Sequence, residues 1–232
     1  AEQPQESADE PAVRLALVLD RSGSMGGAKL ESTRKATGRL IRSLKPEDRV
    51  AMVVYDNNVN VLTDLAAPNK QVANLVEEIF PGGSTNLYGG WVQGAELVGS
   101  EGNVVLLSDG LANMGMFIDA ENLQSQAHYA HTKNGVTTST IGVGEDYDEA
   151  LMAGMAKGGG GNHYFAQDVE AIIEAFSQER FALGAIALEK VTLTWGKTRH
   201  DLRLLFGGEV KRLVLPLKTL HRKPPILDFT VR

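Results

Sequence analysis

The chain has 232 residues, of which 43% are hydrophobic, and carries a net charge of −6 at pH 7. This length and apolar content are enough for one large folded domain and argue against global disorder. The chain contains no cysteine, which excludes disulfides, thiolate metal sites and cysteine nucleophiles, and no apolar run approaches the roughly 20 residues that span a bilayer.

The chain begins with an acidic segment, residues 1–12, that lacks apolar periodicity and is predicted to be a disordered lead-in. Residues 15–19 form a continuous apolar run, which is typical of a parallel strand covered on both faces. Apolar residues at helical spacing then predict a helix over 30–44. A second apolar run at 50–55, followed by a tight turn, predicts a strand and then an antiparallel edge strand at 59–62.

Helices and strands alternate through the middle of the chain. The pattern predicts, in order, helices at 72–80 and 88–98, a strand at 104–107, a helix at 119–134, a strand at 136–143, a helix at 148–156, a strand at 163–166 and a helix capped by Asp168. The glycine run 158–161 is predicted to be a flexible connector. This alternation predicts an α/β domain over residues 13–184, with a doubly wound, mostly parallel sheet that has one antiparallel edge strand.

The apolar period changes from 3.6 to 2 after about residue 185. Alternating residues at 191–195, 202–206 and 227–231 predict strands, and Gly207-Gly208 predicts a hairpin turn into 210–217. Residues 185–232 should therefore form a small antiparallel β appendage. Residues 197–232 also hold nine Lys and Arg against three Asp and Glu, which we interpret as a solvated face of that appendage, with no nucleic-acid partner.

Oxygen-bearing side chains gather at the predicted ends of strands. Asp20, Ser22 and Ser24 follow the first strand at spacing i, i+2, i+4, so in an extended segment they point to one side. Asp109 closely follows the strand at 104–107, and ligands of such sheets bind beyond the carboxyl ends of the strands. Together with Thr85 these groups form an all-oxygen set, which suits a hard divalent cation. An alternative is that the two serines only cap the following helix.

These residues give the chain a specific resemblance. Asp20, Ser22 and Ser24 match the Asp-x-Ser-x-Ser signature, Thr85 in Gly-Gly-Ser-Thr-Asn matches its distal threonine, and Asp109 in Leu-Ser-Asp-Gly matches its distal aspartate. Over about residues 13–183 the chain resembles a von Willebrand factor type A domain with a metal-ion-dependent adhesion site. Asp-Arg-Ser-Gly-Ser-Met and the β-rich flank are most similar to bacterial members of the group that includes calcium-activated-chloride-channel-like and inter-α-trypsin-inhibitor-like domains.

The resemblance implies a Rossmann-like fold and a protein-binding module for adhesion or assembly, without enzymatic activity. It implies that the five residues hold a metal ion, to which an Asp or Glu of a protein partner binds. The compact, hydroxyl-rich set favours Mg²⁺, with Mn²⁺ or Ca²⁺ as possible substitutes.

The loop after Asp109 is unusually apolar. Met114, Met116 and Phe117, joined by Met25 and Tyr147, are predicted to form a rim around the metal that contacts the partner. The alternative is that Met116 and Phe117 pack under the following helix.

Other interpretations remain open. The domain could be a regulatory subunit of a larger complex, such as the partner of an ATPase. A Mg²⁺-dependent phosphohydrolase with Asp20 as nucleophile is disfavoured, because Ser22 stands where such enzymes usually place a second carboxylate. His128 and His131 could share a metal on one helix, although a solvated helix flank is favoured. The sequence selects neither a cytoplasmic nor an extracytoplasmic compartment and leaves the oligomeric state undetermined.

Overall fold

The computed structural model describes residues 12–184, 186–195, 198–206 and 226–231. The predicted acidic lead-in (up to residue 11) and the predicted hairpin into 210–217 lie outside these ranges. The chain divides into two compact units, and residues 12–179 form the one that holds every residue of the predicted site.

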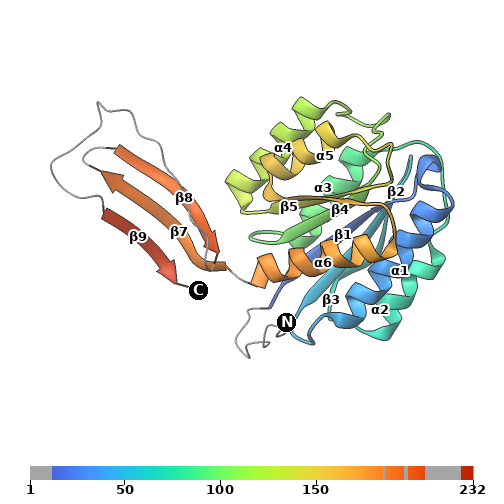
Figure 1. Ribbon diagram of the computed structural model, residues 1–232, viewed down its shortest axis with the longest axis horizontal. Coiled ribbons are helices and arrows are strands. Elements are labelled where there is room, and N and C mark those ends of the chain that lie inside the picture. Colours follow the sequence, from blue (N-terminus) through green and yellow to red (C-terminus); the bar gives the residue numbers. More distant parts are fainter. Residues whose placement is uncertain (1–11, 185, 196–197, 207–225, 232) are drawn as a thin grey trace. The chain divides into compact units, whose positions relative to one another are not determined.

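The larger unit is built on a six-stranded sheet with the order β3-β2-β1-β4-β5-β6 (Figure 1). Its strands are β1 Arg14–Asp20, β2 Arg49–Tyr55, β3 Val59–Ala66, β4 Asn103–Ser108, β5 Thr137–Val143 and β6 Gly160–Ala166. Neighbouring strands run parallel, except that β3 pairs antiparallel with β2 at the edge. The predicted fold class is confirmed.

Helices cover both faces of this sheet. They are α1 Ala28–Ser43, α2 Lys70–Asn74, α3 Leu87–Val98, α4 Ala120–Asn134, α5 Glu149–Gly158 and α6 Val169–Gly184, with 3₁₀ turns η1 Gly23–Met25 and η2 Leu75–Glu78. Figure 1 shows α3, α4 and α5 on one face and α1 and α6 on the other, and α2 packs against α1. None of the helices in the described part of the chain has the length and apolarity needed to cross a membrane.

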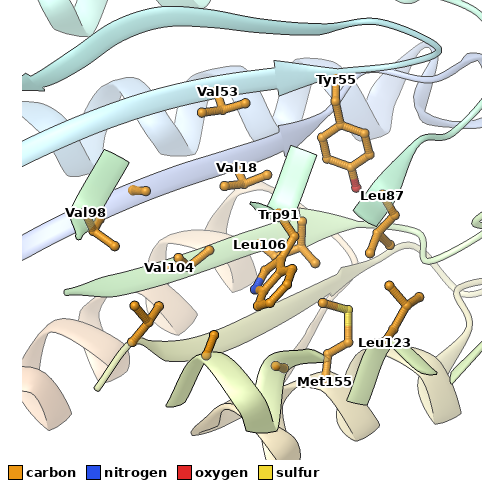
Figure 2. Close-up of a cluster of buried hydrophobic side chains, with 14 of the residues drawn as sticks. Val18, Val53, Tyr55, Leu87, Trp91, Val98, Val104, Leu106, Leu123 and Met155 are labelled. Atoms are coloured by element: carbon orange, nitrogen blue, oxygen red, sulfur yellow. The ribbon is translucent and has the colours of Figure 1, made fainter. Parts of the chain in front are cut away.

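Strand β1 is buried because helices lie on both sides of it. Its residues from Leu15 to Leu19 alternate between the two faces and are all buried. On the face under α3, the indole of Trp91 donates a hydrogen bond of 3.0 Å to the hydroxyl of Thr138; Figure 2 shows Trp91 and Tyr55 among the side chains of this core. A side chain at Gly94 would collide with Val18, so this glycine lets α3 approach the sheet closely.

Two local predictions need correction. The helix predicted at 72–80 runs over residues 70–78, as a short α2 capped by the side chain of Asn69 and followed by the 3₁₀ turn η2, and the backbone is extended at Ile79, two residues before Pro81. The glycine run is not a connector: Gly158 ends α5, and Gly160 begins β6. Side chains at Gly159 and Gly161 would collide with Thr138, so small residues are needed where β6 pairs closely with β5.

The second unit contains the C-terminal strands. β7 Ile186–Trp195, β8 Thr198–Phe206 and β9 Ile226–Val231 form an antiparallel sheet in the order β8-β7-β9. The described part of the appendage is antiparallel, as the period-2 pattern predicted.

Candidate functional site

Two neighbouring strands end in buried aspartates. Asp20 is the last residue of β1, and Asp109 directly follows Ser108 at the end of β4. Because β1 and β4 are parallel neighbours in register, with Leu19 opposite Leu107, their carboxyl ends lie side by side. Both aspartates are completely buried, so two carboxylates meet at one edge of the sheet with little access to solvent.

The loop after β1 folds back over Asp20. The Oδ1 atom of Asp20 accepts a hydrogen bond of 2.7 Å from the backbone N–H of Ser22, and the Oγ atoms of Ser22 and Ser24 lie 3.2 Å apart. The N–H of Met25 donates to the carbonyl of Ser22, which closes the η1 turn. Ser22 is buried and Ser24 is exposed, so the hydroxyl pair extends from the carboxylate toward the surface.

The serines do not cap a helix through their side chains. The residue before α1 is Gly27, and Ser22 precedes η1 without a side-chain capping bond. The capping alternative is therefore wrong, and the two hydroxyls are free to serve another role at this edge.

Thr85 lies in a loop that is bonded to both aspartate loops. Gly82 donates to the carbonyl of Arg21, and Gly23 donates to the carbonyl of Gly83, which joins the threonine loop to the loop after β1. On the other side, the carbonyl of Thr85 accepts bonds of 3.2 Å from the N–H groups of Asn113 and Met114, in the loop after β4. Thr85 is itself buried.

Ser108 and Lys29 contact the aspartates but were not identified from the sequence. Ser108 Oγ donates to Asp20 Oδ2 at 2.5 Å and accepts from the N–H of Gly110 at 2.8 Å. Lys29 Nζ lies 3.2 Å from Asp109 Oδ2. Two features of the sequence could have pointed to these residues: Ser108 ends an apolar strand, and Lys29 lies at the start of a helix.

Tyr55 was missed as well. It pairs with Asp20 in register and is completely buried. Burial, and next the charge of Asp20, raise the pKa of its hydroxyl well above the usual value.

Burial dominates the electrostatics of Asp20. Burial, and to a smaller extent the nearby charge of Asp109, raise the pKa of this carboxyl to about 6, against the opposing effect of hydrogen bonds from Ser108 and Ser22. A cation at this edge would therefore relieve the cost of ionising both carboxylates.

The donor set fits a hard divalent cation. Two carboxylates and the hydroxyls of serine and threonine are the oxygen ligands that Mg²⁺ accepts. Within the described ranges, no three His, Cys, Asp or Glu side chains are grouped so as to hold a metal ion, so a metal here would depend on hydroxyl oxygens.

The predicted rim is partly wrong. Met25 is completely buried, because the η1 turn directs its side chain into the core, and it cannot contact a partner. Phe117 is partly buried: it meets the ring of Tyr88 on α3 edge-on, with centroids 4.8 Å apart, and packs against the hydrophobic core. Met114 and Met116 are exposed.

Tyr147 belongs to a separate aromatic cluster. Its ring stacks on the exposed Phe165 at 5.3 Å, and its hydroxyl lies 3.1 Å from Nε2 of His163. Nδ1 of His163 lies 2.8 Å from the hydroxyl of Thr140, and burial lowers the pKa of this histidine. His128 and His131, the pair considered from the sequence, lie on α4, where His128 is exposed and His131 is partly buried.

Residues 15–179 match the von Willebrand factor type A domain family, and this range includes all five candidate metal ligands. Inter-alpha-trypsin inhibitor heavy chain H4 of Homo sapiens is 25% identical over 245 residues, covering 94% of this chain and 25% of that protein. The chain thus spans about a quarter of the length of this relative.

Solved structures share the fold. A structure described as von Willebrand factor type A from Catenulispora acidiphila has a TM-score of 0.65 at 19% identity, covering 80% of this chain and 46% of that one. The von Willebrand factor domain of the type V pili tip protein Mfa5 from Porphyromonas gingivalis has a TM-score of 0.59 at 16% identity, covering 76% of this chain and 97% of that one.

Proposed function

The chain belongs to the von Willebrand factor type A domain family, and we propose that its larger unit binds a protein partner through a divalent metal ion. The observation that carries the proposal is the pair of buried aspartates, Asp20 and Asp109, at the ends of neighbouring strands with serine hydroxyls beside them. The relatives support an interaction module: one similar protein is a trypsin-inhibitor heavy chain and another is a pilus tip protein.

We assign the metal to five residues: Asp20, Ser22, Ser24, Thr85 and Asp109. Mg²⁺ suits this compact hydroxyl-rich set best, and Mn²⁺ or Ca²⁺ could substitute for it. When bound, the ion would offer an open coordination position. The two carboxylates balance its 2+ charge, and the ammonium of Lys29 beside Asp109 leaves the site with a net charge of +1. A carboxylate of a partner, from Asp or Glu, is the group that such a position attracts.

The chain's own residues hold these ligands in place. Ser108 and the N–H of Ser22 each hold one oxygen of Asp20. The ammonium of Lys29 offsets part of the negative charge of Asp109. The backbone bonds of the Thr85 loop connect the two halves of the site, so the ligands are positioned before any partner arrives.

The geometry favours binding over catalysis. A phosphohydrolase would need an oxygen of Asp20 that the phosphorus atom of a substrate can reach. That carboxylate is completely buried, so a phosphate ester cannot approach it, whereas each of its hydrogen-bonded oxygens keeps a lone pair for a small metal ion. We therefore propose that Asp20 orders the metal site and does not act as a nucleophile.

Titration of the metal-stripped full chain with Mn²⁺, followed by electron paramagnetic resonance, tests the metal assignment. We expect one tightly bound ion per chain that excess Mg²⁺ displaces, and a loss of about tenfold or more in affinity for Asp20→Asn. The matched control is Asp64→Asn, at an exposed carboxylate on β3, which should bind like the wild type. A folded Asp20→Asn variant with unchanged affinity would contradict the assignment.

A further inference from the structure

Exposed hydrophobic side chains concentrate in one loop. Of the eight large hydrophobic residues that are exposed within the described ranges, four lie between β4 and α4: Leu111, Met114, Met116 and Ile118, with exposed fractions of 44%, 43%, 76% and 48%. Single exposed apolar residues are ordinary on a protein surface, but a cluster of them marks an interaction site. We refer to residues 111–118 as the apolar loop.

The backbone of the apolar loop is anchored. The side chain of Asn113 accepts a bond of 2.9 Å from the N–H of Thr85, and the carbonyl of Thr85 accepts two bonds from the loop in return. Phe117 packs edge-on against Tyr88, and Asp119 closes the segment by capping α4. The exposed side chains are thus presented from a fixed backbone, which lowers the entropy lost when a partner covers them.

The apolar loop is continuous with the proposed metal site. The loop starts close to Asp109 in sequence and is hydrogen-bonded to Thr85, so it is directly connected to two of the five assigned ligands. A partner segment whose carboxylate reaches the metal must place its neighbouring residues within reach of this surface. Methionine side chains adapt their shape to such a segment.

The charges near the site restrict those neighbouring residues further. The loop between β5 and α5 carries Glu145, Asp146 and Asp148, and the N–H of Asp148 donates to the carbonyl of Asp109 at 2.9 Å. Additional acidic residues in the partner would meet these carboxylates at close range and be repelled.

We propose that the partner is a protein segment in which a single Asp or Glu is flanked by apolar residues, and that these residues pack on Leu111, Met114, Met116 and Ile118. This inference rests on the proposed function, because binding of the partner's carboxylate to the metal fixes the position of the apolar residues beside that carboxylate. It assigns the apolar loop as the surface that selects between acidic ligands.

The test uses phage libraries that display random seven-residue peptides around a fixed central Asp, with a fixed central Asn as the control library. The full chain is immobilised in Mg²⁺, and bound phage are eluted with EDTA. We expect enrichment from the Asp library only, with apolar residues beside the Asp and few acidic ones. A selected peptide should lose about tenfold in affinity when its apolar flanks are changed to serine.

Variants of the apolar loop test whether this surface recognises the apolar residues that flank the Asp. Met114→Ser and Met116→Ser should abolish the apolar preference, whereas Tyr129→Ser, at a 60% exposed residue on α4, should preserve it. Asp-dependent enrichment without a flank preference, or a preference that survives both methionine changes, would overturn the inference and leave the proposed function standing. No EDTA-eluted enrichment from either library would overturn both. A wild-type dimer that Met116→Ser dissociates would instead assign the loop to a second copy of the chain and overturn the inference.

Discussion

The ammonium of Lys29 lies 3.2 Å from Oδ2 of Asp109, a carboxylate that is completely buried. Lys29 is the second residue of α1, the helix that follows the serine loop. This helix therefore places a cation beside Asp109, which follows a different strand, β4. A metal bound at this edge would share Asp109 with the lysine. The charge balance of the site therefore depends on whether a metal is present.

We expect Lys29→Met to destabilise the metal-free protein by about 1–3 kcal/mol, because Asp109 loses its charged partner while remaining buried. The same change should raise Mn²⁺ affinity, because the metal no longer competes with an ammonium. Urea unfolding in EDTA and metal titration measure the two effects.

The control for Lys29 is Lys35→Met on the same helix. Lys35 pairs with Glu31, and both side chains are largely exposed, so this variant should stay within about 0.5 kcal/mol of the wild type. Equal stability of the Lys29 and Lys35 variants would show that the buried ion pair contributes nothing.

Ser108→Ala should weaken metal binding although Ser108 is not an assigned ligand. Its hydroxyl donates to Asp20 and accepts from Gly110, so its loss releases the carboxylate and leaves a buried N–H unpaired. We expect a destabilisation of about 1–3 kcal/mol and a reduced Mn²⁺ affinity. Ser177→Ala, which removes an exposed hydroxyl bonded to its own helix, is the control and should change neither quantity.

The contribution of Asp20 to the stability of the metal-free protein should rise as the pH falls from 7 toward 4. Burial raises the pKa of Asp20 from 3.8 to about 6, so protonation favours the folded state. This contribution is fully present below the unfolded value and is lost as the pH rises through 6, which amounts to about 3 kcal/mol.

The lowered pKa of His163 acts in the opposite direction, since its neutral form is favoured in the fold and stability falls in acid. The difference between the wild type and Asp20→Asn isolates the aspartate. Urea unfolding in EDTA at pH 5 and pH 7.5 should show that the stability of the wild type relative to Asp20→Asn falls at the higher pH, where the wild type carries the buried charge. A difference between the two proteins that does not change with pH would contradict the raised pKa of Asp20.

Met25 and Met116 should respond differently to truncation. Met25→Ala removes a completely buried side chain and should cost about 2–5 kcal/mol of unfolding free energy. Met116→Ala changes a largely exposed side chain and should stay within about 0.5 kcal/mol. Thermal or urea unfolding of both variants checks that burial separates these two methionines; similar costs would contradict it.

The sequence predicted the strands of the larger sheet well because their apolar runs are long and both faces are covered. The continuous apolar run at 15–19 predicted a buried parallel strand. The tight turn before residue 59 predicted that the next strand would pair antiparallel at the edge of the sheet. The site aspartates could be placed because parallel strands expose their carboxyl ends at one edge.

Contacts between distant residues could not be predicted in this way. Ser108 is 88 residues from Asp20, and Lys29 is 80 residues from Asp109, so no local pattern joins them. Met25 was expected at the surface because loops show no apolar period, and only the 3₁₀ turn determines that its side chain is buried. Leu111 and Ile118 were overlooked because aliphatic residues beside a strand or a helix are usually buried.

A crystal of the full chain soaked in Mn²⁺ and measured at the manganese absorption edge would locate the bound ion. We expect one anomalous difference peak between Asp20 and Asp109, within about 2.5 Å of the hydroxyl oxygens of Ser22 and Ser24. An empty edge at saturating Mn²⁺, with Lys29 still the only cation beside Asp109 among the described residues, would contradict the metal assignment.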